Sequence, residues 1–365
     1  MSDKNFSNSN LFPVSIGLLY DGMEVQEDIY DADATMLIAN RGSLLSTGSI
    51  EKIKALNAGR DIIRVSGHTY KILIERAPPS NTESRKELED STGYTNVKDE
   101  TFRILGEVAS KKTVQPEDMN TVSEELSHRL EATNPSTILS LINALAPVDE
   151  YLQRHCVNVS LLNGLIGKWL GLKKQDVDRL ILVGLLHDCG KALIPHQVLN
   201  APRKLTGVEF EVIKMHPVYS YELLSEFPEA IRRASRGHHE KINGFGYPDR
   251  LTPATIPADA CITAVSDIYD AMVSQRAYKK PRSPFSIMAV LNELVGSELD
   301  GRLVGVFNKN MPLELIDRPV TMSDGAVGIV KSFDPNDIEY PVVEVDGHTI
   351  KTGSTLYCTS MYTAD

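Results

Sequence analysis

The sequence predicts a mainly α-helical protein, in which an all-helical central domain is flanked by two small β-rich segments. Apolar residues recur with helical spacing from Glu100 to about Gly296. Short apolar runs separated by turn residues fill residues 12–76, and strand-like runs with Asp-Gly pairs return after Met311. With 365 residues the chain exceeds what one hydrophobic core usually supports, so several domains are expected.

Four segments follow from these patterns, in chain order. We predict a β-rich N-terminal regulatory module at residues 1–76, with one helix near residues 49–57. Residues 77–99 are polar, contain Pro and Gly and carry few large apolar side chains, which is typical of a linker. The helical domain is expected at residues 100–310 and a C-terminal β appendage at residues 311–365.

The formal net charge of -11 argues against a long nucleic acid or an anionic membrane as a partner, because both require a broad basic surface. No apolar run is long enough to span a bilayer, and the polar start lacks the apolar core of a signal peptide. A cytoplasmic location is therefore expected. The four cysteines show no CxxC spacing and are expected to be reduced, mostly buried thiols.

Histidines and aspartates are concentrated on or at the ends of the predicted helices. His155 shares a face with apolar residues, and the pair His187 and Asp188 ends an apolar helix. His216 follows a helix that begins with a capping box, and Asp267 lies within an apolar run. The full set is His155, His187, Asp188, His216, His238, His239 and Asp267.

A lone histidine on an apolar face is more often a hydrogen-bonded core residue than a metal ligand. Several buried imidazoles and carboxylates in one domain would each be costly to desolvate, however, and a shared cation offsets these costs together. The set lacks thiolates, which suits iron, manganese or zinc. Its size exceeds the needs of one ion, so it predicts two metals about 3.5–4 Å apart and phosphodiester hydrolysis.

Three segments carry a resemblance to a known family: LLHDCGK, HHEKINGFGYP and SDIYDAMVSQRAYKK. They resemble the HD-GYP family of cyclic dinucleotide phosphodiesterases, within the HD superfamily of metal-dependent phosphohydrolases. The resemblance includes the order of the candidate ligands along the chain, H…HD…H…HH…D. The resemblance covers residues 149–307 and implies an all-helical HD-type domain.

The resemblance implies roles for individual residues. A first metal would be held by His155, His187, Asp188 and Asp267, with Asp188 bridging to a second metal held by His216 and His238, and His239 nearby. Asp188 and Lys191 would be catalytic, while Lys191, Arg276, Lys279 and Tyr247 would contact substrate. The GYP loop would comprise Gly244, Gly246, Tyr247 and Pro248. Asp270 would support a metal ligand, and Glu240 would either orient a ligand histidine or be an ordinary carboxylate at a helix end. Tyr247 could either stack on a guanine or pack against the protein.

The activity implied is hydrolysis of cyclic di-GMP to linear pGpG, GMP or both by a metal-bridging hydroxide. The cofactors would be two divalent ions, iron or manganese ahead of zinc or nickel. Cyclic GMP-AMP as substrate and a non-catalytic dinucleotide receptor or scaffold remain alternatives. A diguanylate cyclase domain bound through the GYP loop and a homodimer are further expectations.

Three departures from the family pattern bear on the site. Tyr151 stands where some members carry a glutamate that holds a third metal, which favours two ions here. Asn243 replaces the usual aspartate of the HHExxDG pattern. Cys189 follows the HD pair and is either a small buried filler, which we favour, or a redox-sensitive thiol.

Overall fold

The computed structural model describes residues 11–15, 22–30, 36–55, 62–66, 93–143, 151–199, 201, 203–274 and 282–361. The chain forms two compact units. One contains residues 1–84 with 322–326 and 364–365, and the other contains residues 85–321 and 327–363. The C-terminal strands thus belong for the most part to the helical unit. The boundaries predicted for the four segments stay predictions.

The described residues of the N-terminal unit form two short strand pairs and a helix, in keeping with the small β-rich module that the sequence predicts. Strand β1 (Leu11–Ser15) pairs antiparallel with β4 (Ile62–Ser66), and β2 (Ile29–Tyr30) pairs antiparallel with β3 (Leu37–Ala39). Helix α1 (Thr47–Ala55) follows β3. Its side chain Ile53 is fully buried, as are Met23 and Val25, so this unit has a small apolar core of its own.

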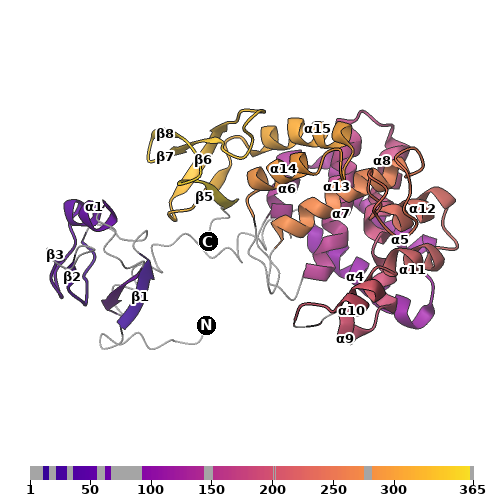
Figure 1. Cartoon of the computed structure of the whole chain (residues 1–365), viewed down its shortest axis with the longest axis horizontal. Helices are drawn as coiled ribbons and strands as arrows, with labels where there is room; N and C mark the ends of the chain where they lie inside the picture. The colour runs from indigo at the N-terminus through magenta and orange to yellow at the C-terminus, as the bar shows by residue number, and fades with distance from the viewer. Residues whose placement is uncertain are drawn as a thin grey trace. The chain divides into compact units, whose positions relative to one another are not determined.

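The second unit is mainly helical, which confirms the predicted fold class (Figure 1). Its helices are α4 (Tyr94–Lys111), α5 (Pro116–Ala132), α6 (Pro135–Asn143), α7 (Tyr151–Trp169), α8 (Lys174–Leu186), α9 (His196–Leu199), α10 (Gly207–Ile213), α11 (His216–Leu223), α12 (Glu229–Gly237), α13 (Ala258–Val273), α14 (Pro284–Glu293) and α15 (Gly301–Asn310), with 3₁₀ helices η3 (Cys189–Leu193) and η4 (Met311–Leu315). Helix α4 begins at Tyr94, inside the predicted linker, because apolar side chains of its first turns, Tyr94 and Val97, are buried.

Helices α7, α8 and α13 pack against one another in the centre of this unit (Figure 1). Leu162, Leu165 and Ile166 on α7 are fully buried, in steps of helical spacing. Gly184 allows α8 to approach the backbone of α7 closely: a Cβ at this position would lie 2.6 Å from the backbone nitrogen of Ser160. This close approach brings the end of α8 next to α7, where the predicted ligands lie.

The C-terminal strands form one five-stranded sheet in the order β8-β7-β6-β5-β9. The strands are β5 (Pro319–Met322), β6 (Val327–Ser332), β7 (Val342–Val345), β8 (His348–Lys351) and β9 (Cys358–Met361). Asp346 and Gly347 both have positive φ, 50° and 76°, in the two-residue turn between β7 and β8. The Asp-Gly hairpin expected from the sequence is therefore present.

Among the described residues, none of the helices combines the length and the apolar character that crossing a bilayer requires.

The contact at Gly184 gives a test of the fold. Gly184→Ala should lower the free energy of unfolding by about 1–3 kcal/mol, because the added methyl group must displace the backbone of α7. Chemical denaturation followed by circular dichroism measures this change. Gly305→Ala is the matched control: Gly305 lies inside α15, where an added methyl group would meet no atom within 4 Å, so alanine there should raise stability by up to about 1 kcal/mol. Equal stability of the two variants would contradict the proposed role of Gly184.

Candidate metal centre

The structure brings the seven predicted ligand residues together from five helices. His155 lies on α7, His187 caps the C-terminus of α8 and Asp188 follows it. His216 is the first residue of α11. The remaining members are His238 at the C-terminus of α12, His239 beside it, and Asp267 within α13. Segments far apart in the chain therefore converge on one point.

Three of the imidazoles are oriented by the backbone of the helix or turn that carries them. In each, Nδ1 lies 2.7 Å from the carbonyl oxygen three residues earlier; the pairs are His187 with Gly184, His216 with Ile213 and His238 with Ser235. A carbonyl oxygen only accepts hydrogen bonds, so Nδ1 carries the proton. The Nε2 atom of each neutral ring then presents a lone pair to the centre.

His155 is held by a side chain instead. Its Nδ1 lies 2.7 Å from Asp270 Oδ2, and Asn158 Nδ2 donates to Asp270 Oδ1 at 2.7 Å. Tyr94 of α4 donates in turn to Asn158 Oδ1 at 2.6 Å. The expected support by Asp270 thus has a direct contact, whereas Asn158 and Tyr94 were missed. The available signal was Asn158 itself, an amide three residues after His155 in an otherwise apolar stripe.

Both aspartates lie between two groups of histidines. Asp188 Oδ2 is 3.4 Å from His155 Nε2 and 3.3 Å from His187 Nε2. Asp188 Oδ1 is 3.1 Å from His216 Nε2 and 3.8 Å from His238 Nε2. Asp267 also divides its oxygens, with Oδ1 3.1 Å from His155 Nε2 and Oδ2 4.0 Å from His239 Nδ1. The family resemblance implied a bridging position for Asp188 but not this division at Asp267.

The donor atoms fit cations. Two groups, His155 with His187 and Asp188, and His216 with His238 and His239, each bring ligand atoms within 4.8 Å of one another, so each could hold a metal ion. The Nε2 atoms of His216 and His238 lie 3.3 Å apart. Because both Nδ1 atoms carry the protons, these two nitrogens present lone pairs to each other, an arrangement that a cation between them stabilises.

Among the candidate ligand atoms of the described residues, His187 Nε2 and Asp188 Oδ1 are buried and lack a hydrogen-bond partner. A buried polar atom without a partner is costly unless an ion or water satisfies it. The set of imidazole nitrogens and carboxylate oxygens, without thiolates, suits a divalent first-row metal.

The protonation states are those that metal ligands need. Burial alone would raise the pKa of Asp188, but Lys191 and His187 prevail and hold that pKa well below its ordinary value. Burial likewise opposes ionisation of Asp267, and the neighbouring His155 still lowers the pKa of that carboxyl. Burial lowers the pKa of His238 well below its ordinary value and that of His239 to about 3. At neutral pH the carboxylates are ionised and these two imidazoles are neutral.

The turn that carries the HD pair is fixed by Ser220 of α11. The Ser220 hydroxyl donates to the carbonyl oxygen of His187 at 2.8 Å and accepts from the amide of Gly190 at 2.9 Å. A Cβ at Gly190 would lie 2.5 Å from the Ser220 nitrogen, so only glycine allows this approach. Gly190 therefore lets η3 pack closely on α11. Ser220 was not predicted.

The GYP loop lies against the histidine cluster. The ring of Tyr247 stacks on His239, with ring centroids 4.7 Å apart and an interplanar angle of 28°. Gly244 has a φ of 77°, in the left-handed region, and a Cβ at Gly246 would lie 2.5 Å from Glu240 Cα. Pro248 follows Tyr247 through a cis peptide bond. Tyr247 thus packs on the protein through His239, and its contact with substrate stays a prediction.

Glu240 differs from the expectation that it orients a ligand histidine. Its carboxylate accepts from the backbone amides of Asp249 at 2.7 Å and Leu251 at 2.9 Å. Glu240 lies beyond the end of α12, and its side chain turns toward the segment after Pro248. It therefore anchors the end of the GYP loop.

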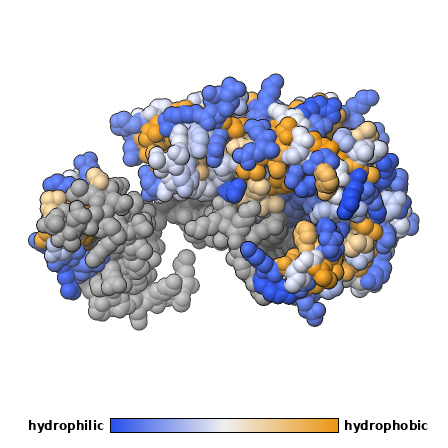
Figure 2. Space-filling model, in the orientation of Figure 1, coloured by the Kyte–Doolittle hydropathy of each residue, from blue (hydrophilic) through white to orange (hydrophobic). Residues whose placement is uncertain are grey.

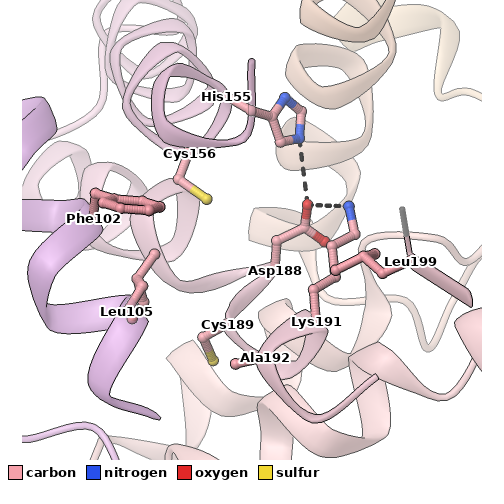
Figure 3. Close-up of a pocket in the computed structure, with 10 residues that line it drawn as sticks. Phe102, Leu105, His155, Cys156, Asp188, Cys189, Lys191, Ala192 and Leu199 are labelled. Atoms are coloured by element: carbon pink, nitrogen blue, oxygen red, sulfur yellow. Dashed lines mark hydrogen bonds and ion pairs between the residues drawn. The ribbon is translucent and has the colours of Figure 1, made fainter. Parts of the chain in front are cut away.

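Of the residues predicted to contact substrate, Lys191 is at the cluster and its ammonium pairs with Asp188 Oδ2 (Figure 3). Arg276 and Lys279 lie outside the described residues. Cys189 is buried, and burial raises its pKa to about 12, so it is a protonated thiol at neutral pH. This agrees with a small buried filler.

Comparisons with known proteins agree with this geometry. Residues 136–303 match the family model described as an HD domain. The chain is 35% identical over 181 residues to the "Cyclic di-GMP phosphodiesterase response regulator RpfG" of Xanthomonas campestris pv. campestris, covering 48% of each chain. It is 30% identical over 179 residues to "3'3'-cGAMP-specific phosphodiesterase 2" of Vibrio cholerae, covering 48% of this chain and 34% of that one.

A solved structure of a protein from Bdellovibrio bacteriovorus, titled "Bd1817, a HDG"Y"P protein", shares the fold. Its TM-score is 0.51 at 14% identity, covering 83% of this chain and 100% of that one. The chain spans about half or less of the length of the two curated relatives named above. Residues 136–303 in the central helical domain therefore match the HD domain family, and a relative that is similar over 181 residues is named as a cyclic di-GMP phosphodiesterase.

Proposed function

We propose that this chain is a metal-dependent phosphodiesterase that hydrolyses cyclic di-GMP with two divalent ions, iron or manganese, held by the histidine and aspartate cluster. The observation that carries the proposal is the arrangement around Asp188, whose two oxygens face two separate groups of imidazole nitrogens. A phosphodiester fits such a site because two cations can contact two of its oxygens. Relatives named as cyclic di-GMP phosphodiesterases support the substrate.

His155, His187, Asp188 and Asp267 would hold one ion, and His216, His238 and His239 the other, with the aspartates shared. Two such ions would acidify the attacking water and neutralise charge on the phosphate. The Nδ1 hydrogen bonds of His155, His187, His216 and His238 keep their rings in place.

The reaction adds the oxygen of water to phosphorus and breaks the bond from phosphorus to O3′, and the leaving oxygen takes up a proton. The product is linear pGpG, and a second hydrolysis yields GMP. Lys191 would donate to a phosphate oxygen as negative charge develops, because its ammonium already lies at Asp188. Tyr247 would keep the ring of His239 in position by stacking on it. Arg276 and Lys279 are proposed as further phosphate contacts on the family pattern alone.

Cyclic GMP-AMP is the second candidate substrate, favoured by relatives named as 3'3'-cGAMP-specific phosphodiesterases. Side-by-side measurement of kcat/KM on the two dinucleotides discriminates between them. A larger value for cyclic GMP-AMP would overturn the assignment to cyclic di-GMP. A diguanylate cyclase partner at the GYP loop and a homodimer stay predictions.

Metal removal tests the proposal directly. Protein purified without oxygen should contain about two divalent ions per chain by elemental analysis, and a chelator should abolish turnover of cyclic di-GMP. Loss of the ions should also lower the melting temperature, because they bind the folded state. Manganese or ferrous iron should restore both. Turnover that survives complete removal of metal would contradict the proposal.

Substitutions can distinguish a residue that binds metal from a residue that contacts the substrate. Asp188→Asn should reduce both metal content and turnover, the latter by more than about 10²-fold, because a charge that faces both groups is lost. Lys191→Met should leave metal content unchanged and reduce kcat by about 10²-fold. Lys174→Met serves as the control, since Lys174 pairs with Glu131 and Asp178 on the surface. Full activity of Lys191→Met would exclude Lys191 from the reaction.

A further inference from the structure

A cavity of about 260 Å³ lies directly beside the metal centre. Its walls come from α4, α7, η3 and α9. Figure 3 shows Phe102 and Leu105 of α4 on one side and His155, Asp188 and Lys191 on the other. The cavity therefore lies between the charged centre and an apolar wall of α4 that contains none of the candidate catalytic residues.

The two ends of the cavity differ in chemistry. At one end lie the carboxylate of Asp188 and the ammonium of Lys191, which are paired with each other. The rest is lined mainly by apolar side chains and by the thiols of Cys156 and Cys189. Burial raises the pKa of each thiol to about 12, so neither carries charge at neutral pH. This lining suits a ligand that has an anionic group at one end and a flat group with apolar faces at the other.

The α4 wall keeps an aromatic ring accessible. Phe102 is 50% exposed, although large apolar side chains are usually buried. Figure 2 shows an apolar area on the helical unit. Phe210 on α10 is as exposed as Phe102. An aromatic ring in this setting is a platform on which a planar group can stack.

Gly106, one turn after Phe102 on α4, also lines the cavity. A Cβ there would meet no atom within 4 Å, so packing within the protein does not require glycine. Its φ is not in the left-handed region either. Glycine inside a helix costs about 1 kcal/mol relative to alanine. Neither packing nor backbone conformation therefore requires glycine here. What glycine does provide is space, because a side chain at position 106 would occupy part of the cavity.

We propose that this cavity receives one purine base of the cyclic dinucleotide, stacked on Phe102, while the adjoining phosphate lies at Lys191 and the metal centre. The inference rests on the proposed function and names the part of the chain that holds the base. The volume is below the roughly 300–1,000 Å³ of clefts that enclose drug-sized ligands, so it suits one base and not a whole dinucleotide.

The side chains that line the cavity also determine whether it can distinguish guanine from adenine. Among the described lining residues, the side chains that could bond a base edge are those already paired at the metal centre, together with the two weakly bonding thiols. Stacking tolerates any base because every base has a π-face. The cavity therefore accepts guanine and adenine alike, and does not itself discriminate between cyclic di-GMP and cyclic GMP-AMP.

Filling the cavity tests this assignment. Gly106→Leu should raise KM for both dinucleotides by at least about tenfold, because the new side chain takes the place of the base. Metal content should stay at the wild-type value, and the melting temperature should not fall, because an added Cβ at this position meets no atom within 4 Å and leucine favours a helix more than glycine does. Gly305→Leu is the matched control, a glycine inside α15 with equally open surroundings, and should keep the wild-type KM.

Changing the ring gives an independent measurement. Phe102→Ala should weaken binding of a non-hydrolysable phosphorothioate analogue of cyclic di-GMP by about 5-fold to 150-fold, the range expected for losing one stacked base. Phe102→Trp should retain binding, and the fluorescence of the new indole should be quenched as the base stacks on it. The chain contains a single other tryptophan, so the signal can be assigned by difference.

The outcomes separate the two proposals. Wild-type turnover with an unchanged KM in Gly106→Leu and unchanged analogue binding in Phe102→Ala would overturn the cavity assignment alone. Wild-type, metal-replete protein that leaves every cyclic dinucleotide intact would overturn the proposed function itself. A raised KM in Gly106→Leu with wild-type metal content supports the cavity assignment.

Discussion

The carboxylate of Asp188 is the group on which the site depends. It is buried, ionised and placed between two sets of imidazole nitrogens, one on each oxygen. An ion in such a place must be compensated by other charges. Every helix that reaches the centre supplies part of that compensation, either as a ligand atom or as the hydrogen bond that aims it. The packing of α7, α8 and α13 is thus inseparable from the electrostatics of the site.

Helix ends do much of the positioning. His187 and His238 are C-terminal caps, and His216 begins a helix, so each ring reaches a carbonyl oxygen three residues earlier. A histidine in the middle of a helix finds that carbonyl already bonded to the backbone. His155 occupies such a position and obtains its support from Asp270 instead. The two solutions have the same result, an Nε2 lone pair directed inward.

The sequence predicted the helical domain and the convergence of the seven ligand residues because both depend on local patterns. Helical spacing shows which face is buried, and the HD pair and GYP segment mark the helix ends. Contacts between distant residues of common type were not predictable. Ser220 and Asn158 look like ordinary polar residues until the fold places them beside His187 and Asp270. Glu240 was assigned to the wrong neighbour because its position beyond α12 turns it toward the loop.

Helix α4 meets the site at two places. Near its start, Tyr94 completes the hydrogen-bond series that ends at His155, and further along the same helix Phe102 and Gly106 line the cavity. The orientation of His155 and one wall of the cavity consequently both depend on helix α4. A movement of α4 would therefore alter the hydrogen-bond support of His155 and the wall of the cavity together.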